Sequence, residues 1–175
     1  PSFQPTTAVV GARCAPARDW AEEAEPARVW DLFCGVGGFA LALAAPGRQV
    51  LGVEVSAQAI DGARAAADLM GLDPALVRLG AGAAQVLAPA AGVRAGGAQR
   101  PDLLVVNPPR RGIGEQLATR IEASGVERVL YSSCNPRTLA ADLAHLPSLQ
   151  VVRSRLFDMF PHTEHAEVLV ELVRG

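Results

Sequence analysis

The stretch RVWDLFCGVGG, residues 28–38, decides the fold of this chain. Its first part, Arg28–Phe33, is a short run rich in β-forming residues and predicts a buried strand. Gly35, Gly37 and Gly38 follow, and glycines let a backbone turn tightly and approach a ligand closely. A strand that runs through such a turn into the apolar helix FALALAA, residues 39–45, is typical of an α/β sheet with a ligand site at the strand's carboxyl end.

Strands and helices alternate outward from this unit. Further strands are predicted over residues 49–55, 75–79, 102–106, 128–133, 151–157 and 167–173. Helices are predicted over 57–71, with Ser56 as N-cap and Gly71 as the stop, over 114–123, and over 136–146, with Asn135 as N-cap and Pro136 in the first turn. The alternation predicts a doubly wound, mostly parallel α/β sheet of seven strands.

The two ends of the chain differ from this regular pattern. The last two strands have no strong helix between them, so they predict a C-terminal antiparallel hairpin. That ending is typical of S-adenosylmethionine (SAM)-dependent methyltransferases rather than of dinucleotide-binding folds. Residues 1–27 predict a helical lead-in that Pro16 interrupts, and residues 80–101 predict an Ala/Gly-rich loop around one weak helix. Residues 28–175 are therefore expected to form the methyltransferase-type domain.

The composition is that of a globular chain. Of its 175 residues, 50% are hydrophobic and 19% are charged, which suits one domain with a sizeable core. No apolar run approaches the ~20 residues of a membrane span, and PSFQPTTAVV lacks the features of a signal peptide. The cysteines, Cys14, Cys34 and Cys134, form no CxxC pair, which argues against a zinc or iron–sulphur site within the chain. We expect a cytoplasmic protein with no membrane contact and no evident protein partner.

Residues at three predicted strand ends suggest a cofactor site. Gly35 lies in the glycine turn, Glu54 lies near the end of the second strand, and Asn107 opens NPP after the fourth. A carboxylate placed like Glu54 accepts two hydrogen bonds from ribose hydroxyls, whether of SAM or of a dinucleotide. Ala40 replaces the third glycine of GxGxxG, which disfavours the dinucleotide. A plain strand–helix turn, a surface acid and an ordinary proline turn remain open for these residues.

A reactive cysteine is predicted at another strand end. Cys134 stands between the strand over 128–133 and the helix that begins near Pro136, where the helix dipole favours thiolate over thiol. Cys14 and Cys34 are expected to be structural. The segment before the last strand offers His162, Glu164, His165 and Glu167. No metal site is expected there, because no other cluster supplies ligands. A polar surface loop, or a carboxylate that acts with Cys134, are the two remaining interpretations.

Four motifs occur together and in order: DLFCGVGGF, VNPPRRGIG, YSSCN and FDMFPHT. The chain resembles the bacterial RNA (uracil-5-)methyltransferases, most closely the branch that modifies 23S rRNA, from about Ser2 to the C-terminus. The resemblance implies SAM-dependent methylation of C5 of a uridine in RNA, with 23S rRNA as the partner. It assigns Cys134 as the nucleophile, Glu167 as the base, and Gln4, Phe33, Glu54 and Asn107 as cofactor contacts.

Cys134 and Glu167 suit the chemistry that this methylation requires. C5 of uracil is a poor nucleophile, and addition of a thiolate to C6 turns C5 into an enolate carbon that can attack the methyl group of SAM. A general base must then remove the C5 proton, after which elimination of the cysteine restores the ring.

Some questions stay open at the level of sequence. Members of the family usually begin with an RNA-binding region and a four-cysteine segment, so an iron–sulphur cluster is expected only in a region that precedes this chain. The net charge of −2 argues against a strongly basic surface, and Arg110, Arg111 and Arg137 are candidate phosphate contacts or ordinary solvated arginines. Methylation of tRNA uridine, a non-catalytic nucleotide- or RNA-binding module, and a nicotinamide oxidoreductase are the alternatives.

Overall fold

A single seven-stranded sheet forms the centre of the molecule in the computed structural model, which describes residues 7–81, 100–158 and 166–175. The strands are β1 (Arg28–Leu32), β2 (Gln49–Glu54), β3 (Val77–Ala81), β4 (Leu103–Val106), β5 (Arg128–Ser133), β6 (Leu149–Asp158) and β7 (Ala166–Arg174). The described helices are α1 (Thr7–Ala24), α2 (Gly38–Ala42), α3 (Ala57–Leu69), α5 (Gly114–Ser124) and α6 (Pro136–Leu143). The predicted seven-stranded α/β fold is confirmed.

The strand order is β3-β2-β1-β4-β5-β7-β6, so the carboxyl ends of the parallel strands lie along one edge of the sheet. The first five strands in this order are parallel, while β7 runs antiparallel to both β5 and β6, which confirms the predicted C-terminal hairpin. The order reverses direction between β1 and β4, and such a switch point opens a crevice at the carboxyl ends of the strands. The glycine turn, Glu54, Asn107 and Cys134 all follow or end parallel strands, so they share this edge of the sheet.

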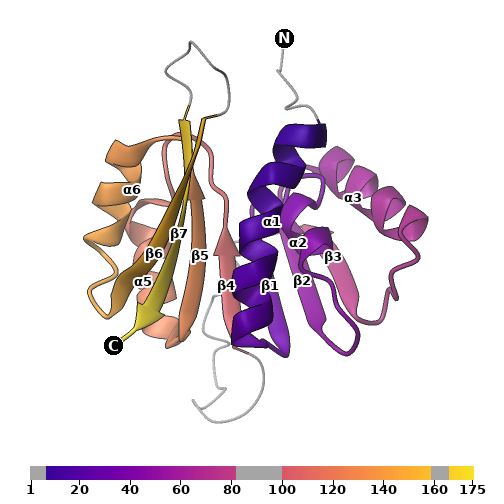
Figure 1. Cartoon of the computed structure of the whole chain (residues 1–175), viewed down its shortest axis with the longest axis horizontal. Helices are drawn as coiled ribbons and strands as arrows, with labels where there is room; N and C mark the ends of the chain where they lie inside the picture. The colour runs from indigo at the N-terminus through magenta and orange to yellow at the C-terminus, as the bar shows by residue number, and fades with distance from the viewer. Residues whose placement is uncertain (1–6, 82–99, 159–165) are drawn as a thin grey trace.

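Helices cover the sheet on both faces, because its strands are buried on both sides. One core packs α1, α2 and α3 against residues such as Val29, Val105 and Leu130. The other packs α5 and α6 against Leu32 and Tyr131. Figure 1 shows α1 lying in front of β1 and β4, with α6 at the opposite end of the sheet from α3. Within the described residues, no helix is long and apolar enough to span a membrane.

The prediction that Pro16 breaks the first helix is wrong, since α1 runs without interruption through it. A proline inside a helix removes one backbone hydrogen bond and clashes with the preceding turn. Tertiary packing outweighs that cost here: Ala17 and Ala21 are fully buried against the sheet. Other elements differ in extent by a few residues: for example, α2 ends at Ala42 instead of residue 45, α6 ends at Leu143 instead of residue 146, and β3 begins two residues later than predicted.

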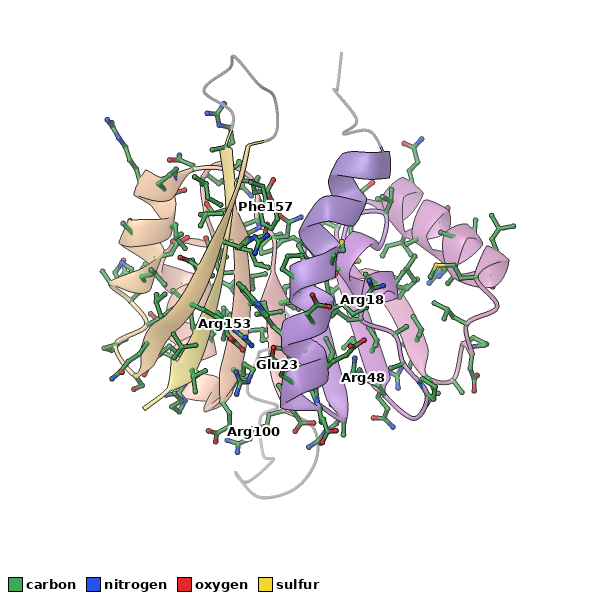
Figure 2. The ribbon with its side chains drawn as sticks, viewed as in Figure 1. Arg18, Glu23, Arg48, Arg100, Arg153 and Phe157 are labelled. Atoms are coloured by element: carbon green, nitrogen blue, oxygen red, sulfur yellow. The ribbon has the colours of Figure 1, made fainter. Side chains whose placement is uncertain are left out.

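A group of charged side chains ties the second half of α1 to the C-terminal hairpin. The guanidinium of Arg153 on β6 lies 4.7 Å from the centre of the Trp20 ring and 2.7 Å from the carboxylate of Glu23. Arg153 also forms an ion pair with Glu171 on β7, which is only 1% exposed and pairs with Arg128 as well. Figure 2 shows Glu23 and Arg153 on the facing sides of α1 and the hairpin.

Candidate active site

Glu54 lies where the predicted cofactor site requires an acid. It is the last residue of β2, and its carboxylate accepts hydrogen bonds from the backbone N–H groups of Gly35, Val55 and Ser56 at 3.1, 2.7 and 3.1 Å. These bonds hold the carboxylate against the glycine turn. Glu54 is half-buried, and its Oε2 accepts only the Gly35 N–H of these three donors, so this oxygen remains able to receive a ligand hydroxyl.

Asp31 is a second acid at this end, and it is fully buried on β1. Its Oδ2 accepts the Ala40 N–H at 2.8 Å, while its Oδ1 has no hydrogen-bond partner among the described residues. Burial, with a smaller contribution from the charge of Glu54, raises the pKa of Asp31 to about 8. A buried polar oxygen without a partner is costly, so Oδ1 marks a place for a hydrogen-bonding partner that a ligand or water supplies.

The backbone between these acids is shaped for a close approach. Phe33 has a φ of 65°, a left-handed conformation that is uncommon for a side chain of its size. Gly35 has a φ of 55°, and a Cβ built on it would meet nothing within 4 Å, so the turn presents open space rather than packed core. Asn107 follows β4 beside this turn, and its backbone N–H lies 3.4 Å from the Leu32 carbonyl oxygen.

Cys134 lies beyond the end of β5 and is exposed, whereas Cys14 and Cys34 are buried. Asn135 caps α6 directly after it, because its side chain accepts the Arg137 N–H at 3.1 Å. The predicted cap is therefore confirmed, and the thiol stands next to the positive end of a helix dipole. By contrast, burial raises the pKa of Cys34 to about 12, so that thiol is unsuited to nucleophilic attack.

Glu167 lies on β7, at the end of the sheet where Cys134 follows the adjacent strand β5. Ser133 of β5 pairs with Val168 of β7, so Cys134 and Glu167 are the next residues along the two strands at this end. Glu167 is 7% exposed, and its Oε1 accepts a hydrogen bond from the Ser132 hydroxyl. A buried carboxylate held in this way has a restricted orientation, and it lies on the same side of β5 as the Ser132 hydroxyl.

Comparison with known proteins identifies the family of this chain. A family model described as tRNA (uracil-5-)-methyltransferase matches residues 2–175. The chain belongs to this family. It is 46% identical over 172 residues to a 23S rRNA (uracil(747)-C(5))-methyltransferase of Vibrio vulnificus, and 47% identical over 174 residues to the enzyme of that name in Halothiobacillus neapolitanus. Each alignment covers 98% of this chain but only 44% of the relative, so the chain spans less than half of their length.

Solved structures of two methyltransferases are similar to the fold of this chain. The Pyrococcus abyssi tRNA (uracil-54, C5)-methyltransferase, in complex with S-adenosyl-L-homocysteine, superposes with a TM-score of 0.75 at 28% identity, over 98% of this chain and 40% of that chain. The SAM-bound magnesium protoporphyrin IX methyltransferase of Synechocystis has a TM-score of 0.69 at 12% identity, over 100% of this chain and 87% of that one. The second likeness shows the SAM-dependent methyltransferase fold alone.

The residues present at the uracil-5-methyltransferase family's cofactor end fit SAM. The unpartnered, buried oxygen of Asp31 would receive a donor, Glu54 would accept hydroxyls, and the open turn at Gly35 would admit the ligand. Gln4, predicted as a further contact, lies outside the described residues, as do His162, Glu164 and His165 of the rejected metal cluster. Within the described residues, no group of three or more His, Cys, Asp and Glu side chains could hold a metal ion.

Sequence reasoning missed three residues of this region. Asp31 opens the glycine-rich motif, and its place there was a usable signal. Ser132 stands in YSSCN, where it looks like an ordinary strand residue until β7 lies beside it. Asp142 looks like a surface acid on a short helix, yet it is 4% exposed and bonded to the loop after β4. An acid on the buried face of an amphipathic helix was the available signal.

Proposed function

We propose that this chain is the cofactor-binding and catalytic part of an enzyme that methylates C5 of a uridine in 23S rRNA. The placement of Cys134 and Glu167 next to the paired Ser133 and Val168, at the same end of β5 and β7, supports this proposal most directly. The names of the Vibrio and Halothiobacillus relatives favour 23S rRNA over tRNA as the substrate. An rRNA substrate would place the enzyme in the cytoplasm.

The carboxyl edge of the sheet divides into two halves along the strand order. Glu54, Phe33, Gly35 and Asn107 lie on the β2-β1-β4 side and form the proposed cofactor contacts, with Asp31 beneath them. Gln4 is proposed to add a contact from the lead-in. When bound there, SAM supplies an electrophilic methyl group. Cys134 and Glu167 lie on the β5-β7 side, so the uracil is proposed to enter between the two halves.

Cys134 is the proposed nucleophile. Its thiolate forms an S–C6 bond to uracil, and the electron pair of the C5–C6 double bond moves onto C5 and the C4 carbonyl. The enolate carbon then takes the methyl group as the methyl–sulphur bond of SAM breaks and its electron pair stays on that sulphur, which would leave as a neutral thioether; C5 then bears both a methyl group and its original proton. The exposed position of Cys134 leaves the sulphur accessible to a base that an RNA strand presents.

Glu167 is the proposed base. Its carboxylate removes the C5 proton, the electron pair re-forms the enolate, and the C6–S bond breaks to release Cys134 as thiolate. The hydroxyl of Ser132 donates a hydrogen bond to Oε1 of Glu167, which holds the carboxylate in place beside the end of β5. Loss of a positioned base costs ~10²–10⁴-fold in rate, so removal of this carboxylate should stall the reaction after methyl transfer.

The test uses the full-length protein, SAM and a 23S rRNA fragment, with mass spectrometry under denaturing conditions. An RNA that carries 5-fluorouridine should trap the wild-type protein as a covalent adduct, since fluorine at C5 blocks proton removal. Cys134→Ala should abolish both methylation and the adduct, while the control Cys14→Ala should retain both. Glu167→Gln should accumulate methylated RNA attached to Cys134 on ordinary uridine substrate. Normal turnover by Glu167→Gln would assign the base elsewhere, with Glu164 and His165 the next candidates.

The RNA approaches a chain whose formal net charge is −2, so its contacts must be local. Arg110 and Arg111 follow the NPP motif and Arg137 follows the Cys134 turn, and all three are exposed. No ion pair within the described ranges engages any of them. We propose that they contact phosphates beside the reactive uridine. The iron–sulphur cluster expected from the family resemblance would belong to a preceding region and stays a prediction.

A further inference from the structure

Asp142 is a buried acid on α6 that reaches across to another loop. Its Oδ2 accepts the Ile113 N–H at 2.9 Å and the Tyr131 hydroxyl at 2.5 Å, and its Oδ1 accepts the Gly114 N–H at 3.0 Å. Tyr131 is itself fully buried on β5, and burial and its hydrogen bond to Asp142 both raise the pKa of its phenol. One carboxylate thus joins α6, β5 and the loop after β4.

The loop approaches Asp142 so closely that only glycine fits at the nearest position. Gly112 has a φ of +78°, and a Cβ built on it would lie 2.3 Å from Asp142 Oδ2. That distance is far below any van der Waals contact, and the backbone conformation is itself unfavourable for other residues. The glycine in NPPRRGIG therefore serves the contact with this acid.

A second tie joins the same two segments nearer to Cys134. The carbonyl oxygen of Arg110 accepts hydrogen bonds from the side-chain amide of Asn135 and from the hydroxyl of Thr138, both at 3.1 Å. Asn135 also caps α6, and its backbone N–H donates to the Ser133 hydroxyl at 3.1 Å. The loop over residues 107–114, which carries Asn107, is thus bonded near both ends of α6: to Asn135 and Thr138 beside Cys134, and to Asp142 in the last turn.

We propose that Asp142 is a positioning residue for methyl transfer: it holds the loop over residues 107–114 against α6, so that the cofactor side and Cys134 keep a fixed separation. This inference rests on the proposed function, since it takes Cys134 as the nucleophile and Asn107 as a cofactor contact. Neither Asp142 nor Tyr131 needs to touch the reacting atoms. A displacement of about 1 Å between reacting groups can cost ~10²-fold in rate, so a clamp of this kind matters for catalysis.

Asp142→Asn in the full-length protein tests the inference. The amide keeps the shape of the side chain but offers one acceptor oxygen, so it cannot receive all three donors. We expect the single-turnover rate of methyl transfer to a 23S rRNA fragment, at saturating SAM and RNA, to fall by ~10²-fold. The Kd for SAM should change much less than the rate, because Glu54 on β2 and Asp31 on β1 stay in place and only the Asn107 contact lies on the loop. Tyr131→Phe removes one donor and should give a smaller loss, not additive with that of Asp142→Asn.

Val129→Ala is the matched control, because Val129 is fully buried on β5 beneath the same helical layer but has no part in the clamp. It should lower Tm while leaving the single-turnover rate close to wild type. A wild-type rate in Asp142→Asn, or an equal rate loss in Val129→Ala at equal loss of Tm, would overturn the positioning role. A wild-type protein that neither methylates uridine nor forms the 5-fluorouridine adduct would instead overturn the proposed function, and the role of Asp142 with it.

Discussion

At the scale of single residues, three buried acids serve three different purposes in this molecule. Asp142 has both carboxylate oxygens bonded to backbone or hydroxyl donors, so it is a structural link. Glu167 accepts a hydrogen bond from the Ser132 hydroxyl near the end of β5. Asp31 alone keeps a buried oxygen with no partner among the described residues, and its pKa is raised to about 8. Burial by itself therefore does not define the role of an acid, whereas its remaining hydrogen-bonding capacity does.

Asp31 should make the stability of the protein fall as pH rises. Its pKa is near 3.8 in the unfolded chain and about 8 in the folded protein, so between these values the folded state holds a proton that the unfolded state has lost. Its contribution to stability is therefore fully present below about pH 4, is lost progressively as pH rises to about 8, and stays constant above that. Asp31→Asn carries no titrating proton, so the variant should gain stability relative to wild type over this window, by at most ~1.4 kcal/mol per pH unit.

Urea unfolding of both proteins at several pH values between 5 and 8 measures this difference without SAM. Only the difference between the two proteins is informative, because it cancels the other titrating groups. A difference that is the same at every pH would show that Asp31 is ionised throughout. Glu54, whose charge contributes to the raised pKa, is kept unchanged in both proteins.

At the scale of elements, α1 is held on the sheet partly by contacts with the C-terminal hairpin, β6 and β7. Its apolar contacts are mostly small residues, such as Ala17 and Ala21. Arg153 adds a ring contact with Trp20 and ion pairs to Glu23 and Glu171, and these residues come from three separate elements. The second half of α1 is therefore positioned by β6 and β7 as well as by its own apolar contacts with the core.

Arg153→Ala should destabilise the fold more than Glu23→Ala, although the two side chains bind each other. Arg153 leaves a carboxylate that is 1% exposed with one partner fewer, and a hydrogen bond to a charged group contributes about 1.5–3 kcal/mol. Glu23 is 63% exposed, so loss of its side of the pair should cost about 0–1 kcal/mol. Thermal or urea unfolding of the two variants measures both costs, and equal losses would mean that the exposed pair, not the buried one, holds α1.

At the scale of the whole molecule, exposed arginines gather at one edge of the sheet although the net charge of the chain is negative. The chain is acidic overall, yet exposed arginines without ion pairs in the described ranges lie on the loops at the carboxyl edge of the sheet. Glu54, at the end of β2, lies on the same edge, so acidic and basic side chains occupy different strand ends along it. This arrangement suits a cationic cofactor on one side and a phosphate backbone on the other.

Charge reversal at the edge should weaken RNA binding in a salt-dependent way. In the full-length protein, the double variant Arg110→Glu and Arg111→Glu should lower RNA affinity and reduce the slope of log K against log salt by about 1–2, because each phosphate contact contributes ~0.7–0.9 to that slope. Arg78→Glu, on the exposed surface of β3, is the matched control and should change neither quantity. Binding titrations at several salt concentrations measure both, and an intact slope in the double variant would exclude the patch.

The sequence by itself determined the fold class, the strand and helix order, the caps at Ser56 and Asn135, and the family. These depend on local signals: hydrophobic period, turn residues and helix ends act over a few positions and are legible without tertiary contacts. It also determined the residue types at each strand end, because parallel strands deliver those ends to one edge. Proposed roles for Cys134, Glu167, Phe33, Glu54 and Asn107 stay predictions that the fold accommodates.

Only the tertiary structure decided how distant segments act on one another. The continuity of α1 through Pro16, the unpartnered oxygen of Asp31 and the reach of Asp142 to Gly112 all depend on neighbours that are remote in sequence. A buried polar group is defined by which donors and acceptors surround it, and that environment exists only after the sheet has assembled. The amphipathic pattern of the helix can indicate that Asp142 is buried, but no residue near it in sequence indicates which loop it binds. Its role therefore appears only in the three-dimensional structure.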